Sequence, residues 1–182
     1  VIVRKIQYIR AVLMIKNIIF DFDGVLVDSE ILVAKSFCRY LTKRNINFDE
    51  KKFSKFAGKK TIQVVSELSE LFNIADKKSF FNDIISLANG IYSNELRAVF
   101  GALHFLENTN HNRFIGSNSP KERIVRGLKK AGIDNYFNEE IIISFDLVEK
   151  PKPEPDVYQK IMDIANLEKD ETIIIEDSVT GI

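Results

Sequence analysis

The sequence has few of the features that would place it outside the ordinary globular proteins. Its single cysteine, Cys38, cannot form an internal disulfide, and helix-like surroundings favour a small buried hydrophobe in a reducing compartment. The 26 basic and 26 acidic residues cancel, so the total charge gives no sign of a nucleic-acid or anionic-membrane partner. No apolar run approaches the roughly 20 residues needed to span a bilayer. We therefore expect a cytoplasmic protein with no membrane segment and no signal peptide.

What is present is typical of a folded, soluble chain. Of its 182 residues, 45% are hydrophobic and 29% charged, which allows one sizeable core or a core with a small accessory unit. Residues 1–13 precede Met14 and are interpreted as an extension of doubtful structure. The sequence ends just past an apolar run, at "IIIEDSVTGI", so we expect the C-terminal part of the core to be missing. A monomer or weak dimer is the expected state.

Short isoleucine-rich runs alternate with helix-like segments in the second half of the chain. Each run is too short for a helix and is bounded by polar or turn residues, which favours buried parallel strands. The segment 119–132 predicts a helix, with Ser119 and Glu122 as a capping box and Gly132 as the stop. The alternation predicts an α/β fold, a Rossmann-like doubly wound parallel sheet. The four expected strands lie at 18–20, 113–116, 140–145 and 172–176.

Helical periodicity without strand signals runs from about residue 30 to residue 92. Apolar residues recur there at helical spacing and predict three or four helices; two of the apolar faces are Ile31, Ala34, Cys38 and Leu41, and Ile62, Val65, Leu68 and Phe72. So long an insert is a small domain and not a loop. We therefore expect an α/β core formed by 14–27 and 100–182, with an inserted α-helical cap domain at 28–99.

Polar groups follow each expected strand at its carboxyl end, where open α/β sheets bind ligands. Every one has a structural explanation as well, as a solvated loop charge, a turn residue or a helix cap. Their joint occurrence in one order is harder to explain that way, and it favours a functional site. In chain order the groups are Asp21 and Asp23, Ser117, Lys152, then Glu176 and Asp177.

Four ordered motifs resemble those of the haloacid dehalogenase (HAD) superfamily of phosphotransferases. They are "DFDGV", the strand end "FIGS", "KPKPEPDVY" and "IIIEDSVTGI", and they extend from Ile18 to the last residue. The helical insert between the first two is similar to the cap of the subgroup that contains β-phosphoglucomutase and phosphoglycolate phosphatase. The resemblance therefore implies a HAD-like core with a helical cap.

The resemblance also implies roles for individual residues. Asp21 resembles the nucleophile that forms an aspartyl-phosphate, and Asp23 the acid/base that protonates the leaving oxygen and later activates water. Ser117 and Asn118 would bind the transferred phosphoryl group together with Lys152, which would balance its charge. An acid at position 23 is expected of phosphatases and mutases, so dehalogenation is disfavoured.

A divalent cation is expected on two grounds. The resemblance implies Mg²⁺ held by Asp21, the backbone carbonyl of Asp23, and Asp177, with Glu176 close by. Electrostatics independently favours it, because these acids would crowd a phosphate dianion that Lys152 alone cannot offset.

The cap is expected to select the substrate. The stretch "FAGKKT" contains Gly58, Lys59 and Lys60, and related caps place substrate-contacting residues on such a loop. Solvated lysines beside an ordinary turn are an equally good interpretation.

The leading prediction is a HAD phosphoric monoester hydrolase, a Mg²⁺-dependent phosphatase acting on a small phosphorylated metabolite such as a sugar or sugar-acid phosphate. One alternative is a β-phosphoglucomutase-like phosphomutase, which would return the phosphoryl group to another hydroxyl. The other, from a different class, is a truncated, non-catalytic fragment or binding module.

Overall fold

A computed structural model describes residues 15–56, 59–178 and 181 of the chain. The chain forms two compact units, one comprising the residues up to Asp28 and from Arg97 onward, the other Ser29–Leu96. Within the described residues no helix is long and apolar enough to cross a membrane. The predicted extension at 1–13 lies outside the described residues.

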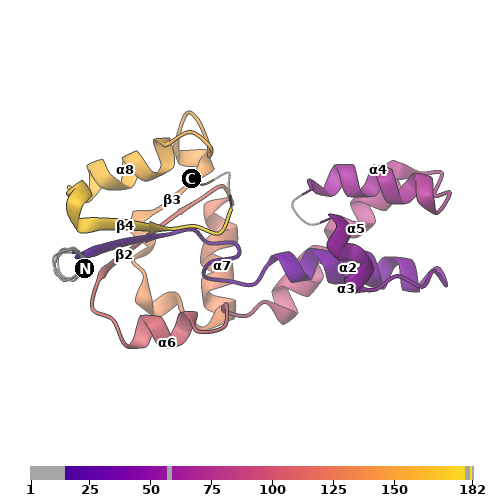
Figure 1. Cartoon of the computed structure of the whole chain (residues 1–182), viewed down its shortest axis with the longest axis horizontal. Helices are drawn as coiled ribbons and strands as arrows, with labels where there is room; N and C mark the ends of the chain where they lie inside the picture. The colour runs from indigo at the N-terminus through magenta and orange to yellow at the C-terminus, as the bar shows by residue number, and fades with distance from the viewer. Residues whose placement is uncertain (1–14, 57–58, 179–180, 182) are drawn as a thin grey trace, which may run out of the picture. The chain divides into compact units, whose positions relative to one another are not determined.

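The first unit is built on a parallel sheet of four strands in the order β3-β2-β1-β4 (Figure 1). All four overlap the isoleucine-rich runs that predicted strands, with β1 and β2 slightly longer than predicted, so the predicted α/β class is confirmed. The strands are β1 (Asn17–Phe20), β2 (Asn112–Ser117), β3 (Ile142–Ser144) and β4 (Thr172–Ile175).

Helices cover both faces of this sheet. Successive residues of a strand point to opposite faces, and on β1 Ile19 belongs to one cluster with Val157 and Ile161 of α8, whereas the Phe20 ring meets that of Phe105 in α6 at 6.2 Å. α8 and α6 therefore lie on opposite faces, as Figure 1 shows. The α-helices of this unit are α6 (Ala102–Glu107), α7 (Lys121–Ala131) and α8 (Asp156–Ile164). Short 3₁₀ turns lie at Asp134–Tyr136, Glu139–Ile141, Phe145–Leu147 and Lys169–Glu171.

The two ends of α7 differ in how well the sequence predicted them. Gly132 ends the helix in a left-handed conformation, φ 71°, which confirms the predicted glycine stop. The predicted capping box at Ser119 is wrong: the capping position is Pro120, and no side chain caps the helix. The Ser119 hydroxyl instead donates a hydrogen bond to Asp23, 96 residues earlier in the chain.

The second unit is helical, as its periodicity predicted. Its core consists of aromatic and branched side chains from all three long helices, including Phe37, Leu68 and Phe80. Ile31 and Ile62, which the periodicity assigned to buried faces, are 38% and 56% exposed. The elements are α2 (Glu30–Thr42), α3 (Glu50–Phe53), a 3₁₀ turn (Ser54–Phe56), α4 (Thr61–Leu71) and α5 (Lys77–Glu95).

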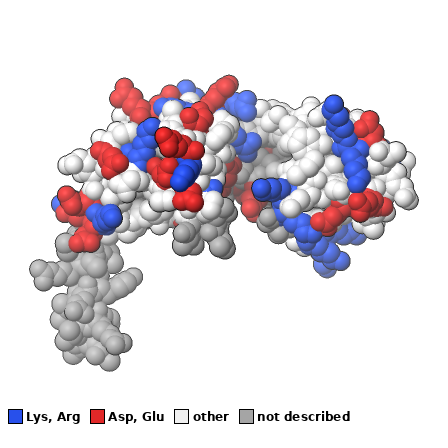
Figure 2. Space-filling model, turned by 90° about the horizontal axis from the view of Figure 1, so that it is seen from above, with Lys and Arg blue, Asp and Glu red and all other residues white. Residues whose placement is uncertain are grey.

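The strand order places a topological switch at β1. The chain leaves β1 toward β2 and β3 on one side and returns to β4 on the other, and such switch points open a crevice beyond the carboxyl ends of the strands. Figure 2 shows acidic and basic side chains interspersed over the visible surface, in line with the balanced composition. A charged site must therefore form from a local cluster of side chains, and the carboxyl end of β1 is where the fold favours one.

Candidate active site

Lys152 joins the two strand ends that flank this crevice. Its Nζ donates to Asp21 Oδ1 at 2.7 Å and to Glu176 Oε1 at 3.0 Å. Asp21 directly follows β1 and Glu176 directly follows β4, and β1 and β4 are paired in register. The three side chains are almost completely buried, with Lys152 only 4% exposed. Asp21 and Glu176, which lie 131 and 24 residues from Lys152 in the sequence, thus share its ammonium group.

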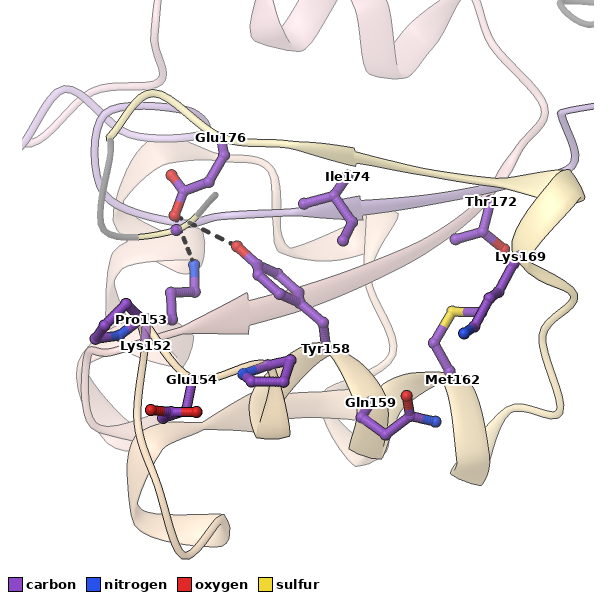
Figure 3. Close-up of a pocket in the computed structure, with 12 residues that line it drawn as sticks. Lys152, Pro153, Glu154, Tyr158, Gln159, Met162, Lys169, Thr172, Ile174 and Glu176 are labelled. Atoms are coloured by element: carbon purple, nitrogen blue, oxygen red, sulfur yellow. Dashed lines mark hydrogen bonds and ion pairs between the residues drawn. The ribbon is translucent and has the colours of Figure 1, made fainter.

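The loop that carries Lys152 is fixed by neighbours from two directions. Asn118, just past β2, exchanges two hydrogen bonds of 3.0 Å with the backbone of Lys152, one from its amide nitrogen and one to its amide oxygen. The ammonium also lies 4.7 Å from the centroid of the Tyr158 ring in α8, a cation–π contact. Tyr158 OH in turn donates to Glu176 Oε1 at 3.3 Å (Figure 3). The motif "KPKPEPDVY" ends at this tyrosine, but only the lysine was assigned a role from the sequence.

Burial and the shared cation shift the pKa values in different directions. Burial raises the pKa of Asp21 to about 6, against the opposing charge of Lys152, and nearby Glu176 adds to the rise. Burial would also raise the pKa of Glu176, but its hydrogen bond and charge interaction with Lys152 outweigh this and lower it. Burial alone would lower the pKa of Lys152, yet the charge of Asp21 and the hydrogen bonds raise it. The lysine is therefore a cation, and it leaves Asp21 only partly compensated.

A cluster of acids at this point fits a hard metal ion. Asp21, Glu176 and Asp177 each offer a carboxylate oxygen, and these oxygens lie within 4.8 Å of one another. Burial raises the pKa of Asp177, and the negative charge of Glu176 adds to the effect. All-oxygen donors with excess negative charge are the ligands that Mg²⁺ and similar ions prefer. The arrangement therefore suits the divalent cation that the sequence predicted.

Gly24 makes room for this cluster. Its φ is +84°, and a Cβ at this position would lie 2.0 Å from Asp177 Oδ2. The residue must therefore be glycine for two reasons, the left-handed backbone and the carboxylate packed against it.

The Asp23 side chain lies in space beside the amino end of α7. It does not belong to the cluster of Asp21, Glu176 and Asp177. Its Oδ2 accepts the hydrogen bond from Ser119 Oγ, and its Oδ1 lies 3.4 Å from Arg123 Nη2. Ser117, 2% exposed, accepts a hydrogen bond from the Ser119 backbone N–H at 3.1 Å. The acid at 23 and the hydroxyl at 117 are thus linked through Ser119. Sequence reasoning missed both Ser119 and Arg123 because serine and arginine at the start of a helix have ordinary structural explanations.

The predicted substrate residues of the second unit lie beside a cavity of about 460 Å³ that Lys59 and Lys60 help to line. Lys59 Nζ forms an ion pair with Glu67 at 2.7 Å, and the Lys60 backbone N–H donates to the side chain of Gln63 at 3.0 Å. Gly58 lies outside the described residues. The substrate role of these residues stays a prediction.

A larger cavity of about 530 Å³ lies between α8 and β4 (Figure 3). Lys152 and Glu176 line one end of it, but Asp21, Asp23 and Ser117 do not, and much of its wall consists of apolar groups such as Met162 and Ile174. The cavity therefore shares only Lys152 and Glu176 with the group of side chains that meets at the strand ends.

Comparison with known proteins agrees with the geometry. The family model described as "Haloacid dehalogenase-like hydrolase" matches residues 18–182. The chain belongs to this family. The match covers the sheet except for Asn17 and includes all of the residues that meet at its strand ends, and it confirms the resemblance read from the sequence.

Two proteins similar to this chain are phosphatases by name. The chain is 24% identical to 6-phosphogluconate phosphatase of Escherichia coli K12 over 92% of its own length and 76% of the relative's. It is 27% identical to pyrophosphatase PpaX of Oceanobacillus iheyensis, over 90% and 75%. A solved HAD family hydrolase from Deinococcus radiodurans with bound phosphate and sodium superposes with a TM-score of 0.77, at 28% identity over 92% and 74%. Family and relatives support a phosphoric monoester hydrolase.

Proposed function

We propose that this HAD family member is a Mg²⁺-dependent phosphatase that hydrolyses a small phosphomonoester through an aspartyl-phosphate. The observation that carries the proposal is the ammonium of Lys152, buried between Asp21 and Glu176 at the carboxyl ends of two paired strands. Burying charges costs several kcal/mol each, and a protein core has no structural need for them. A site that must accept a phosphoryl group does need both acids and a fixed cation.

In the first half-reaction Asp21 attacks phosphorus. A carboxylate oxygen of Asp21 forms a bond to phosphorus while the ester oxygen–phosphorus bond breaks. Asp23 gives a proton to the departing oxygen, which leaves as an alcohol. Lys152 and the Ser117 hydroxyl hold the oxygens of the phosphoryl group during transfer.

In the second half-reaction water attacks the phosphorus of the aspartyl-phosphate. Asp23, now deprotonated, takes a proton from that water, the bond between Asp21 and phosphorus breaks, and inorganic phosphate is released. Asp21 is restored as a carboxylate and Asp23 as an acid, so the cycle closes. Because Asn118 holds the Lys152 loop by two hydrogen bonds, the cation keeps its place in both steps.

Asp21, Glu176 and Asp177, with the backbone carbonyl of Asp23, would hold the Mg²⁺ ion. When bound, the ion supplies positive charge that offsets the developing charge on the phosphoryl oxygens. The support within this chain is the convergence of three carboxylate oxygens within 4.8 Å.

The direct test replaces Asp21 by asparagine, which keeps the size of the side chain and removes its nucleophilicity. With p-nitrophenyl phosphate and Mg²⁺, we expect Asp21→Asn to abolish turnover and chelation of the metal to abolish it in the natural chain. Asp170→Asn is the matched control, because Asp170 is exposed and precedes the opposite end of β4. Undiminished turnover by Asp21→Asn would rule out the covalent role.

The natural substrate is proposed to be a sugar or sugar-acid phosphate, selected by the helical unit that the sequence assigned to 28–99. The support is the phosphatase named for 6-phosphogluconate among the relatives. A panel of phosphorylated metabolites, with release of inorganic phosphate as the readout, tests this. A product that retains its phosphate and a requirement for a bisphosphate activator would favour the phosphomutase instead. Gel filtration and a melting curve of this chain, beside a version extended from the gene, would separate a folded monomer or weak dimer from a non-catalytic fragment.

A further inference from the structure

The first turn of α7 and the segment just before it hold the carboxylate of Asp23 at both of its oxygens. Ser119 Oγ donates to Oδ2, and Arg123 Nη2 lies 3.4 Å from Oδ1 as an ion pair. The donors come from 96 and 100 residues further along the chain. Asp23 and Arg123 are 29% and 32% exposed in their side chains, so the contact is neither a core packing contact nor a fully solvated pair.

Asp23 needs such support because its backbone contact, an isolated bridge to Val27, does not fix its side chain. It precedes Gly24, whose φ of +84° belongs to a tight turn, and it lies outside the regular part of β1. A partly exposed carboxylate on a turn would sample several rotamers, and a misplacement of about 1 Å can cost a reaction about 100-fold. Two donors on separate oxygens fix both the position and the plane of the carboxyl group.

We propose that Ser119 and Arg123 are positioning residues that hold Asp23 for proton transfer to the leaving oxygen. The inference rests on the proposed function, in which Asp23 passes its proton to the ester oxygen as the oxygen–phosphorus bond breaks. Ser119 also donates its backbone N–H to Ser117 Oγ at 3.1 Å, so one residue sets the acid relative to the hydroxyl that holds the phosphoryl group.

The chemistry gives this role a signature that a structural role lacks. An alkoxide is a poor leaving group and requires the proton from Asp23, whereas nitrophenolate leaves without one. Loss of positioning should therefore slow phosphoryl transfer from an alkyl phosphate to Asp21 and leave transfer from an aryl phosphate almost unaffected. Because Asp23 also takes the proton from water in the second half-reaction, which both esters share, the contrast is expected in kcat/KM, which reports only the steps up to loss of the alcohol. Loss of folding would slow both equally.

The experiment measures kcat and KM of Ser119→Ala and Arg123→Gln with β-glycerol phosphate and with p-nitrophenyl phosphate in the presence of Mg²⁺. We expect kcat/KM for the alkyl ester to fall about 10- to 100-fold, with kcat/KM for the aryl ester within about threefold. Ser119→Thr should keep the alkyl rate because it keeps a hydroxyl. Arg126→Gln, an exposed arginine one turn along the same helix, is the matched control.

A double-mutant cycle decides whether the effect passes through Asp23. In an Asp23→Asn background, Arg123→Gln should add no further loss with the alkyl ester, since the group being positioned is gone. Equal losses of kcat/KM on both esters, or a full further loss in the Asp23→Asn background, would overturn the inference alone. A natural chain inactive on both esters would overturn the proposed function and this inference with it.

Discussion

Removal of the Lys152 ammonium should destabilise the first unit strongly. Lys152→Met keeps the aliphatic length of the side chain but leaves Asp21 Oδ1 and Glu176 Oε1 without the donor that now lies at 2.7 and 3.0 Å. All three side chains are at most 11% exposed, and removing one partner of a buried ion pair costs about 3–5 kcal/mol. We expect a loss of about 3 kcal/mol in the metal-free protein, the lower end of this range, because Asp21 can take up a proton in place of the lost charge.

The loss of unfolding free energy should depend on pH, and the protonation of Asp21 determines whether the loss grows or shrinks as the pH rises. Burial already raises the pKa of Asp21 to about 6, and removing the ammonium raises it further. A folded state that binds a proton which the unfolded chain does not bind loses stability as the pH rises through the raised pKa. The difference between Lys152→Met and the natural chain should therefore be larger at pH 8 than at pH 5.

The assay is urea denaturation of metal-free protein at both pH values, with Lys150→Met as the matched control because Lys150 is exposed in the same loop. Saturating Mg²⁺ should reduce the difference in urea midpoint between Lys152→Met and the natural chain, since a dication replaces the missing positive charge. Equal midpoints for Lys152→Met and Lys150→Met at pH 8 would refute the reasoning that the buried lysine holds two acids together.

Three further predictions concern the acid cluster. Gly24→Ala should weaken Mg²⁺ binding and turnover by at least about tenfold, because its Cβ would lie 2.0 Å from Asp177 Oδ2. The magnitude is that of typical losses when the surroundings of metal ligands are disturbed. Gly101→Ala, with φ +87° and nothing within 4 Å of the added Cβ, shares the backbone strain but should keep activity. Calorimetric titration should show Mg²⁺ affinity falling below about pH 6, because protons then compete for Asp21, and an affinity constant from pH 5 to pH 8 would contradict this. Tyr158→Phe should lower unfolding free energy by about 1 kcal/mol, and an unchanged urea midpoint would show that its hydroxyl contributes nothing.

Much of the fold was predictable because each strand is a short apolar run with polar ends. The runs at 18–20 and 172–176 overlap the paired strands β1 and β4, and an acid directly follows each strand, so a parallel sheet was bound to bring Asp21 and Glu176 to one edge. The helical faces of the second unit were less predictable, because burial there is set by how the three long helices pack. Ile31 and Ile62 have the right spacing but are exposed.

The contacts that tune the site could not be inferred from the sequence. Ser119 followed by proline and an acid is the ordinary pattern of a helix start, and only the fold reveals that its hydroxyl turns to Asp23 instead. Tyr158 lies six residues after Lys152, a separation that predicts no side-chain contact. Only the structure reveals that the lysine ammonium lies over the tyrosine ring. Long-range side-chain partners of this kind depend on three-dimensional packing and not on local pattern.

The most direct test of the account is identification of the residue that carries phosphorus during turnover. Enzyme quenched with acid during steady-state hydrolysis should, after borohydride reduction and peptide mapping, contain homoserine at position 21, the product expected from an aspartyl-phosphate. The Asp21→Asn protein should give none. Hydrolysis that proceeds with no modified residue at 21, or with phosphorus on a different side chain, would contradict the central claim.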